Sequence, residues 1–236
     1  MCYHIQSPQI EKLQAFSDKH LVGLDFQPAE YTAYYHVSGH EHPRLPVLSG
    51  NQVRLLEWGL IPSDVKDPSA ATNIREQTLN AEAETIFDHP SFKQSIFKDR
   101  GVLLVEGFFQ WREYGGKKYP YFIQDEALLR IGCTISEWMD PSTGELRTTF
   151  SIITTPANKK MEVIHNTGKR MPLILEDFKK WLEPDLQQPD IASLILPYRG
   201  ELKAWTVSDK LNLEGKEKTN VPDISKPVSY PELPDL

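Results

Sequence analysis

Four apolar, β-prone segments follow one another through the middle of the chain. They are Gly101 to Trp111, Tyr119 to Gln124, Leu128 to Glu137 and Arg147 to Thr155. Gly115 and Gly116 separate the first two segments, Pro141 to Gly144 separates the last two, and both are turn signals of β-hairpins. Hairpins join neighbouring antiparallel strands, whereas parallel strands need long crossovers. The pattern therefore predicts a mostly antiparallel sheet.

Shorter elements flank this centre. Further strands are predicted at Tyr31 to Val37, Pro46 to Leu48, Val53 to Trp58, Met171 to Leu175 and Glu201 to Val207. Helices are predicted after a cap at Ser7, and at Thr78 to Asp88, Ser91 to Lys98, Asn158 to Ile164, Glu176 to Leu182 and Asp190 to Leu196, with a loop at Pro62 to Ala71. Strands and helices do not alternate as in βαβ units. We therefore expect one α+β domain, residues 1–214, with a barrel-like sheet flanked by short helices.

Proline and charged residues dominate from Gly215 onward, without periodicity. Residues 215–236 are predicted to be a Pro-rich tail that lies extended over the body or is disordered.

The composition is that of a globular protein. Hydrophobic residues make up 39% of the 236 residues and charged residues 25%, which suffices for a substantial core. Cys2 and Cys133 are the only cysteines, so no disulfide framework is predicted. The N-terminus lacks the pattern of a secretory signal, and no apolar run is long enough to span a membrane. We expect a cytoplasmic protein with no membrane partner.

Cys2 has the most distinctive chemistry. Removal of Met1 would leave an α-amine and a thiol on one residue, with reference pKa values of about 8 and about 8.5. The amine can condense with an aldehyde to a Schiff base, and the thiol can then close a five-membered thiazolidine ring. An abasic site in DNA presents such an aldehyde in its ring-opened form. The alternative is that Cys2 is an incidental buried small residue.

Glu106 interrupts the strongly apolar segment Gly101 to Trp111. Burial would raise the pKa of its carboxyl group and make it a general acid. At a strand end in solvent it would be an ordinary surface carboxylate. Alternation of polar and apolar residues does not decide between these interpretations.

Two further polar residues have a functional and a structural interpretation. His165 ends a short predicted helix beside the basic residues Lys169 and Arg170, where it could transfer protons. Asn80 lies at the start of the predicted helix Thr78 to Asp88, where its amide could orient a reacting group. The alternatives are a structural histidine and an ordinary helix start.

His36, His40 and His42 lie close together in the sequence, with Glu41 between two of them. Alternating histidines can bind zinc. No cysteine or second carboxylate is placed to complete the ligand shell. We therefore interpret the segment as a solvated loop, and we expect neither a metal nor a cofactor.

Five short motifs occur in the order in which one protein family carries them. They are a cysteine at position two, Trp58 to Pro62, Asn80 to Thr85, Glu106 to Trp111, and Ile164 with His165 ahead of Arg170 to Pro172. The chain thus resembles the SRAP family, named for SOS response-associated peptidases, over residues 2 to 175. The family includes the bacterial and animal abasic-site crosslinking proteins.

The resemblance implies a function in the DNA damage response. It implies binding of single-stranded DNA and a thiazolidine link between Cys2 and an abasic site. Carried over by position, Cys2 is the nucleophile, Asn80 holds it, Glu106 is the acid/base that helps to open the sugar, and His165 assists proton transfer. The family name implies a peptidase activity, which could amount to self-removal of Met1. Schiff-base chemistry also allows DNA cleavage by β-elimination, a lyase side reaction.

The expected phosphate contacts depart from the family pattern. Tyr3 and His4 stand where the family usually has Gly-Arg, Glu82 stands where it usually has Arg, and Asp64 stands where it has Trp. The formal net charge is −7, whereas nucleic-acid-binding proteins usually carry a net positive charge or a basic patch. Net charge is only a sum, however, and a basic groove can coexist with acidic surfaces elsewhere.

Other residues are therefore predicted to contact DNA. Arg112, Lys169 and Arg170 are the first candidates for phosphate contacts, because each lies within a few residues of a motif. Trp58 and Phe108 are candidates for stacking on bases.

Two other functions remain open. A thiol peptidase using Cys2 and His165 would need no DNA and agrees with the negative charge. A non-catalytic DNA-binding descendant of the family would account for Glu82 and for the residues that follow Cys2.

Overall fold

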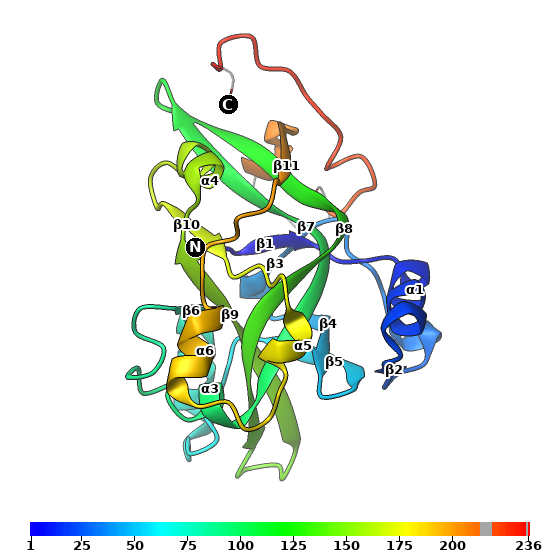
Figure 1. Ribbon diagram of the computed structural model, residues 1–236, viewed down its shortest axis with the longest axis vertical. Helices are drawn as coiled ribbons and strands as arrows, with labels where there is room; N and C mark the ends of the chain where they lie inside the picture. Colours follow the sequence, from blue (N-terminus) through cyan, green and yellow to red (C-terminus); the bar gives the residue numbers. More distant parts are fainter. Residues whose placement is uncertain (213–218, 235) are drawn as a thin grey trace.

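The computed structural model describes residues 1–212, 219–234 and 236, in which the strands form one 11-stranded sheet (Figure 1). The strands are β1 (His4–Gln6), β2 (Gly23–Leu24), β3 (Val37–Ser38), β4 (Arg44–Ser49), β5 (Gln52–Trp58), β6 (Asn80–Glu82), β7 (Arg100–Tyr114), β8 (Lys117–Met139), β9 (Leu146–Pro156), β10 (Arg170–Pro172) and β11 (Lys203–Thr206). The α-helices are α1 (Ile10–His20), α2 (Pro68–Gln77), α3 (Ser95–Lys98), α4 (Lys159–Ile164), α5 (Phe178–Trp181) and α6 (Gln188–Leu194). Three 3₁₀ helices cover Pro28–Glu30, Gly39–Glu41 and Asp209–Asn212.

The sheet closes on itself through the long strand β8. The pairing order β8-β9-β5-β4-β7 returns to β8, because β8 pairs with both β7 and β9. The remaining strands extend this ring at its edges. Among the described strands, only the pairs β2–β5, β5–β9 and β6–β9 are parallel. The predicted α+β fold with a mostly antiparallel, barrel-like sheet is confirmed.

The two predicted hairpins connect β7, β8 and β9. Gly115 and Gly116 form the first turn with φ of 55° and 75°, a conformation that favours glycine. The second turn contains Gly144 with φ of 72°. The two strands predicted between these turns are one continuous strand.

A bulge interrupts the pairing of β7 and β8. The register shifts between Val105 and Gly107, and residues 125–128 of β8 lie opposite Glu106 without a pairing partner. A Cβ at position 107 would lie 2.4 Å from the carbonyl oxygen of Ile123, so this close approach requires glycine. Bulges redirect side chains, and the alternation of β7 therefore does not continue through Glu106.

The core has two main clusters on opposite faces of β7. Leu103 and Val105 point into the cluster that contains Cys2. Val102 and Leu104 point into the cluster that is covered by α1 and α5. The N-terminal residues and α1 therefore serve different faces of the sheet.

Three local predictions were wrong: the helix start at Asn80, the loop at Pro62 to Ala71 and the cap at Ser7. Asn80–Glu82 is strand β6 instead of a helix start, because it adds in parallel to the edge of β9. Helix α2 was missed, although Asp67 caps it by accepting from the N–H of Ser69 at 3.0 Å and Pro68 occupies its first turn. Ser7 does not cap α1, since its hydroxyl accepts from the N–H of Tyr34 at 2.8 Å.

In the part of the chain that the structure describes, no helix has the length and apolar character needed to cross a membrane.

Residues 219–234 contact the body of the protein at several points. The Trp205 indole N–H donates to the carbonyl of Ser225 at 2.8 Å, and the Thr206 hydroxyl donates to that of Val228 at 2.6 Å. Ile224 is 2% exposed and packs in a third cluster with Phe109. The predicted boundary at 214/215 lies outside the described residues, so the division into a domain and a tail stays a prediction.

This packing predicts that Ile224→Ala lowers the free energy of unfolding by about 2 to 4 kcal/mol, because the substitution opens a cavity in a closed cluster. Val228→Ala is the matched control, since Val228 is 37% exposed in the same segment. It should change the free energy by no more than about 0.5 kcal/mol. Urea unfolding followed by tryptophan fluorescence measures both, and equal effects of the two variants would contradict the packing.

Candidate active site

Cys2 is fixed just before β1, against β6. Its backbone N–H donates to Asn80 Oδ1 at 3.2 Å, and the residue is 1% exposed. The following strand pairs with β7, with His4 opposite Phe109. Burial raises the pKa of the Cys2 thiol to about 12, so the thiol is neutral at pH 7.

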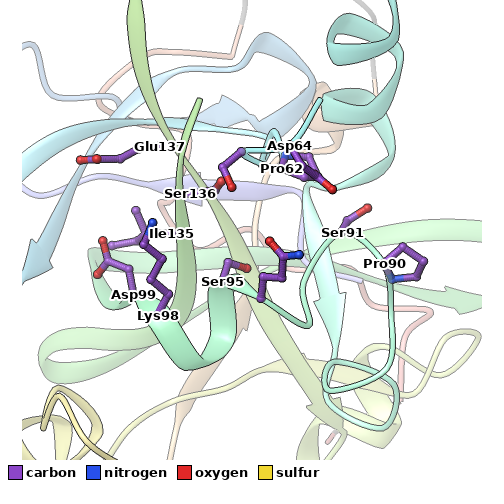
Figure 2. Close-up of a pocket in the computed structure, with 12 residues that line it drawn as sticks. Pro62, Asp64, Pro90, Ser91, Ser95, Lys98, Asp99, Ile135, Ser136 and Glu137 are labelled. Atoms are coloured by element: carbon purple, nitrogen blue, oxygen red, sulfur yellow. The ribbon is translucent and has the colours of Figure 1, made fainter. Parts of the chain in front are cut away.

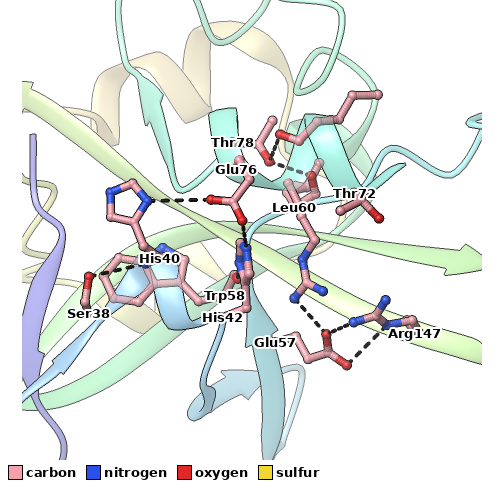
Figure 3. A network of polar contacts seen from close by, with 12 residues as sticks. Ser38, His40, His42, Glu57, Trp58, Leu60, Thr72, Glu76, Thr78 and Arg147 are labelled. Carbon is pink, nitrogen blue, oxygen red and sulfur yellow. Dashed lines mark hydrogen bonds and ion pairs between the residues drawn. The ribbon is translucent and has the colours of Figure 1, made fainter. Parts of the chain in front are cut away.

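The Trp58 to Pro62 motif positions Asn80 through two hydrogen bonds, of which Figure 3 shows the one between Thr78 and Leu60. The Trp58 indole N–H donates to the carbonyl of Leu79 at 2.7 Å. The Thr78 hydroxyl donates to the carbonyl of Leu60 at 2.6 Å. These two bonds fix the backbone immediately before Asn80. The motif therefore acts on the site through positioning, without contacting Cys2 in this network.

The oxygen of the Asn80 amide is hydrogen-bonded, whereas its nitrogen has no partner among the described residues. Its Oδ1 accepts from Cys2, which fixes the orientation of the amide group. Its Nδ2 is buried and has no hydrogen-bond partner among the described residues. A buried donor left unsatisfied costs about 1–3 kcal/mol. The site thus holds a donor that a ligand oxygen can satisfy.

Gln110 is a site residue that sequence reasoning missed. It is 3% exposed on β7, and its Nε2 donates to the carbonyl oxygen of Met1 at 3.0 Å. That carbonyl belongs to the peptide bond between Met1 and Cys2. Gln110 lies inside the Glu106 to Trp111 motif, in which Glu106 is the only carboxylate.

Glu106, to which the resemblance assigns the acid/base role, does not join this group. Its carboxylate pairs with Lys12 at 2.6 Å, on the face covered by α1. The strand register explains the separation. Gln6, the last residue of β1, lies opposite Gly107, so Glu106 lies beyond the C-terminal end of β1. Cys2 precedes the other end of that strand. The side chain that β7 contributes near Cys2 is Gln110.

His165 follows α4 and lies near the N-terminus. Its Nδ1 is 2.9 Å from the carbonyl oxygen of Arg170. Burial lowers the pKa of His165, and the positive charge of the Met1 amine lowers it further. Burial also lowers the pKa of that amine. The Arg170 backbone N–H also lies 3.3 Å from Nδ1. In either tautomer a neutral ring has one unprotonated nitrogen, which can accept a proton.

Two predicted base-stacking residues are buried. Trp58 and Phe108 are each 0% exposed, and Trp58 lies parallel to Phe150 with ring centroids 6.2 Å apart. Neither ring can stack on a base unless the core opens. In this structure both side chains are therefore core packing residues.

The predicted cations differ in availability. Arg112 is 8% exposed and donates to the carbonyl of Pro234 at 2.7 Å. Arg170 pairs with Glu84 at 2.5 Å. Lys169 is exposed and has a φ of 47°. Of the three, only Lys169 is a surface cation, and the other two are held by neighbouring groups.

The three clustered histidines do not converge on one point. His40 and His42 both contact the Glu76 carboxylate, at 3.6 and 2.8 Å (Figure 3). His36 instead faces His4 at 3.0 Å. Within residues 1–212, 219–234 and 236, no group of three or more His, Cys, Asp or Glu side chains could hold a metal ion.

A small cavity of about 110 Å³ between α3 and β8 is separate from these residues (Figure 2). Ser91, Ser95, Asp99 and Glu137 line it. Asp64, one of the departures from the family pattern, is also at its edge. It contains none of the predicted site residues.

The His4–His36 pair predicts a loss of stability in acid. The two rings stack 5.1 Å apart, and burial lowers the pKa of both, that of His36 to about 4. An unfolded histidine has a pKa of about 6.5, so the unfolded chain takes up protons first as the pH falls. Stability should therefore decrease between pH 6.5 and 4, by about 1.4 kcal/mol per pH unit for each group.

Urea unfolding at pH 7.5, 6 and 5 measures this slope. His4→Gln should flatten it, and exposed His89 provides the control substitution His89→Gln. Identical slopes for wild type and His4→Gln would show that the pair does not titrate as described.

The comparisons with known proteins agree with the motifs. Residues 1–213 match the family model described as SOS response associated peptidase (SRAP). The chain belongs to this family. Another SRAP-like chain, the abasic site processing protein YoqW of Bacillus subtilis, is 33% identical over 204 residues, which cover 83% of this chain and 86% of that protein.

Two further comparisons extend the match. The abasic site processing protein HMCES of Xenopus tropicalis is 31% identical over 166 residues, which cover 60% of this chain and 48% of that protein. A crystal structure of a protein from Bacteroides thetaiotaomicron superposes with a TM-score of 0.87 at 34% identity, covering 97% of this chain and 100% of that one. The SRAP membership predicted from the five motifs is confirmed.

Proposed function

We propose that this SRAP protein captures abasic sites in single-stranded DNA through a covalent link to Cys2, after removal of Met1. The observation that carries the proposal is the contact of the Cys2 nitrogen with Asn80 Oδ1 at 3.2 Å. Once Met1 is absent, the same oxygen would hold the α-amine beside the thiol of its own residue. The names of the relatives YoqW and HMCES, both abasic site processing proteins, support this direction.

The reaction joins the amine, the thiol and the aldehyde with loss of one water. The amine lone pair attacks the aldehyde carbon of the ring-opened sugar, and the resulting carbinolamine loses water to give an imine. The Cys2 sulfur then bonds to the imine carbon, and the thiol proton passes to the nitrogen, which closes the thiazolidine ring.

Two residues near Cys2 can assist the loss of water and the proton transfers. The free Nδ2 of Asn80 can donate to the oxygen that leaves as water. The neutral His165 can accept and return a proton. We assign no acid/base role to Gln110, because an amide does not titrate in this range.

Because Cys2 is only 1% exposed, the abasic sugar must leave the base stack to reach it, which favours single-stranded DNA. A flexible strand can turn its abasic sugar out of the stack at low cost, whereas a duplex must be opened. Lys169 is our proposed phosphate contact. Cleavage by β-elimination would compete at the imine stage, and ring closure by the thiol would suppress it.

Intact mass after incubation with a single-stranded oligonucleotide that carries one abasic site tests the proposal. The expected product has the mass of the protein without Met1 plus the oligonucleotide minus one water. The same oligonucleotide without the abasic site is the control. Turnover of peptides without any adduct would replace this proposal with the thiol peptidase.

A second activity, self-removal of Met1, is favoured by one contact. Gln110 Nε2 donates to the carbonyl oxygen of the bond that must be cleaved, at 3.0 Å. A donor at that position stabilises the oxyanion formed when water adds to the carbonyl. The bond between carbon and the Cys2 nitrogen then breaks, which releases methionine and the free amine.

Gln110→Ala should therefore leave Met1 in place when the chain is made in a reconstituted translation system that lacks methionine aminopeptidase. Loss of one oxyanion donor slows such steps about 100- to 1000-fold. Mass spectrometry of the N-terminal peptide measures the retained fraction in wild type and variant. Retention of Met1 in both would show that removal depends on a separate enzyme.

A further inference from the structure

A second cavity, of about 590 Å³, lies between α1, the β7–β8 bulge and β11. Helix α1 contributes Phe16, Lys19 and His20, and the bulged strand contributes Leu128 and Arg130. Figure 1 shows α1 on the side of the molecule away from β10 and α4, which flank the N-terminus. The cavity is therefore separate from the Cys2 site, and its apolar side chains belong to the other core cluster.

Every carboxylate in the cavity wall already has a partner. Glu106 pairs with Lys12 at 2.6 Å, and Glu126 pairs with Lys203 at 3.0 Å. Asp125 accepts a hydrogen bond from a tyrosine hydroxyl at 3.1 Å. The charges of Glu106 and Glu126 are thus neutralised by lysines, whereas Asp125 has the tyrosine as its partner and keeps its charge.

Among the residues that the structure describes, Arg130, Lys19 and His20 face the cavity without a carboxylate partner. Arg130 Nε is buried and has no hydrogen-bond partner, and among the described residues no ion pair reaches its guanidinium group. Lys19 and His20, in the last turn of α1, have no acidic partner in the described part of the chain either. Burial lowers the pKa of His20, and the charges of Lys19, Lys179 and Arg130 lower it further. Arg130 and Lys19 thus carry positive charge on this wall without an ion-pair partner among the described residues, whereas the lowered pKa favours the neutral ring of His20.

An aromatic wall lies beside these cations. The Arg130 guanidinium carbon is 5.7 Å from the ring centroid of Phe178. The His20 ring lies 4.5 Å from that of Phe16 and 5.1 Å from that of Phe178. Phe16, His20 and Leu128 line the cavity itself and offer a surface that suits a flat ring, whereas Phe178 supports Arg130 and His20 through these contacts. The volume is within the range of about 300–1,000 Å³ usual for small-molecule sites.

We propose that this cavity binds a terminal phosphate monoester attached to a nucleoside, with Arg130 as the phosphate anchor. The two cations without an ion-pair partner, Arg130 and Lys19, match the two charges of a monoester dianion better than the single charge of a carboxylate. The arginine fork can bond two phosphate oxygens at once, and the aromatic wall accommodates the base. Such a group occurs on a free nucleotide and on the 5′ end of a DNA strand. The binding needs no aldehyde and is independent of Cys2 chemistry.

Titration calorimetry and ¹⁵N-resolved NMR with defined probes test this site. The probes are deoxyadenosine 5′-monophosphate, deoxyadenosine, inorganic phosphate, and one unmodified oligonucleotide with either a 5′-phosphate or a 5′-hydroxyl. The monophosphate should bind more tightly than the nucleoside or phosphate alone, with shifts at α1 and at residues 124–130. Tighter binding of the monophosphate than of the 5′-phosphorylated strand identifies the free nucleotide as ligand, and the reverse identifies the strand end.

Two variants and a matched control separate binding from folding. Arg130→Gln should weaken binding by about 10- to 100-fold, the amount expected for a lost charged hydrogen bond. Lys19→Glu changes an exposed residue, so it should weaken binding without affecting the fold. Arg44→Gln removes the same charge from an exposed residue of β4 and should bind as wild type does.

Unchanged affinity in both Arg130→Gln and Lys19→Glu would overturn the proposal. Equal binding of deoxyadenosine and its monophosphate would also overturn it, as would NMR shifts confined to the Cys2 side. Because no probe carries an aldehyde, these outcomes are independent of whether Cys2 captures abasic sites.

Discussion

The Cys2→Ala variant is expected to form no stable adduct with abasic single-stranded DNA while remaining folded. Ring closure needs sulfur on the same residue as the amine, and alanine provides only the amine. The variant should still give a Schiff base that borohydride traps, because the α-amine and Asn80 remain. The lost sulfur is a small buried group, so the free energy of unfolding should fall by only about 1 kcal/mol.

Denaturing gel electrophoresis after heating, with and without borohydride, distinguishes the two linkages. Cys133→Ala is the matched control, since Cys133 is the other buried cysteine and burial raises the pKa of its thiol as well. It lies within β8 and carries no free amine, so this control should crosslink as wild type does. A heat-stable adduct of Cys2→Ala without borohydride would exclude the thiazolidine.

Local signals predicted those parts of the fold that short-range chemistry determines. The hairpin at Gly115 and Gly116 needs positive φ values, which the sequence reveals directly. Asn158 caps α4 by accepting from the N–H of Met161 at 3.0 Å. The pairing of Cys2 with Asn80, 78 positions apart, followed instead from motifs whose shared chemistry requires contact.

The position of Glu106 away from the Cys2 site has a structural cause. Period-two alternation tells which face of a strand a residue occupies only while the register is regular. The bulge between Val105 and Gly107 breaks that register at the residue in question. The unpaired residues of this bulge, 125–128, lie on β8 and not on β7. The sequence around Glu106 therefore does not reveal that Gln110 is the side chain that contacts Met1.

Long-range packing buries three of the predicted DNA-contact residues, Arg112, Trp58 and Phe108. Arg112 is engaged by the carbonyl of Pro234, 122 positions away. Trp58 is covered by Gly39, where a Cβ would lie 3.0 Å from the indole ring. Neither contact has a sequence signal, because each depends on where a distant segment packs. Availability of a cation or a ring for DNA is therefore a property of the fold.

The last prediction concerns the amine. A chain extended at its N-terminus ahead of Met1 should form no adduct with abasic DNA, although its Cys2 thiol is intact. The Cys2 nitrogen is then a peptide nitrogen, whose lone pair is delocalised and does not attack an aldehyde. Met1 is 38% exposed, so an extension can leave the site without displacing Cys2 or Asn80.

Cleavage of the same preparation with a protease that cuts directly before Cys2 provides the matched comparison. Adduct formation should rise from undetectable to the level of the mature protein, because only the amine has been released. Intact mass must be read at both stages, since self-removal of the extension would also free the amine. An adduct whose mass includes the uncut extension would show that the thiol reacts alone, and the proposed role of the Cys2 amine held by Asn80 would then be wrong.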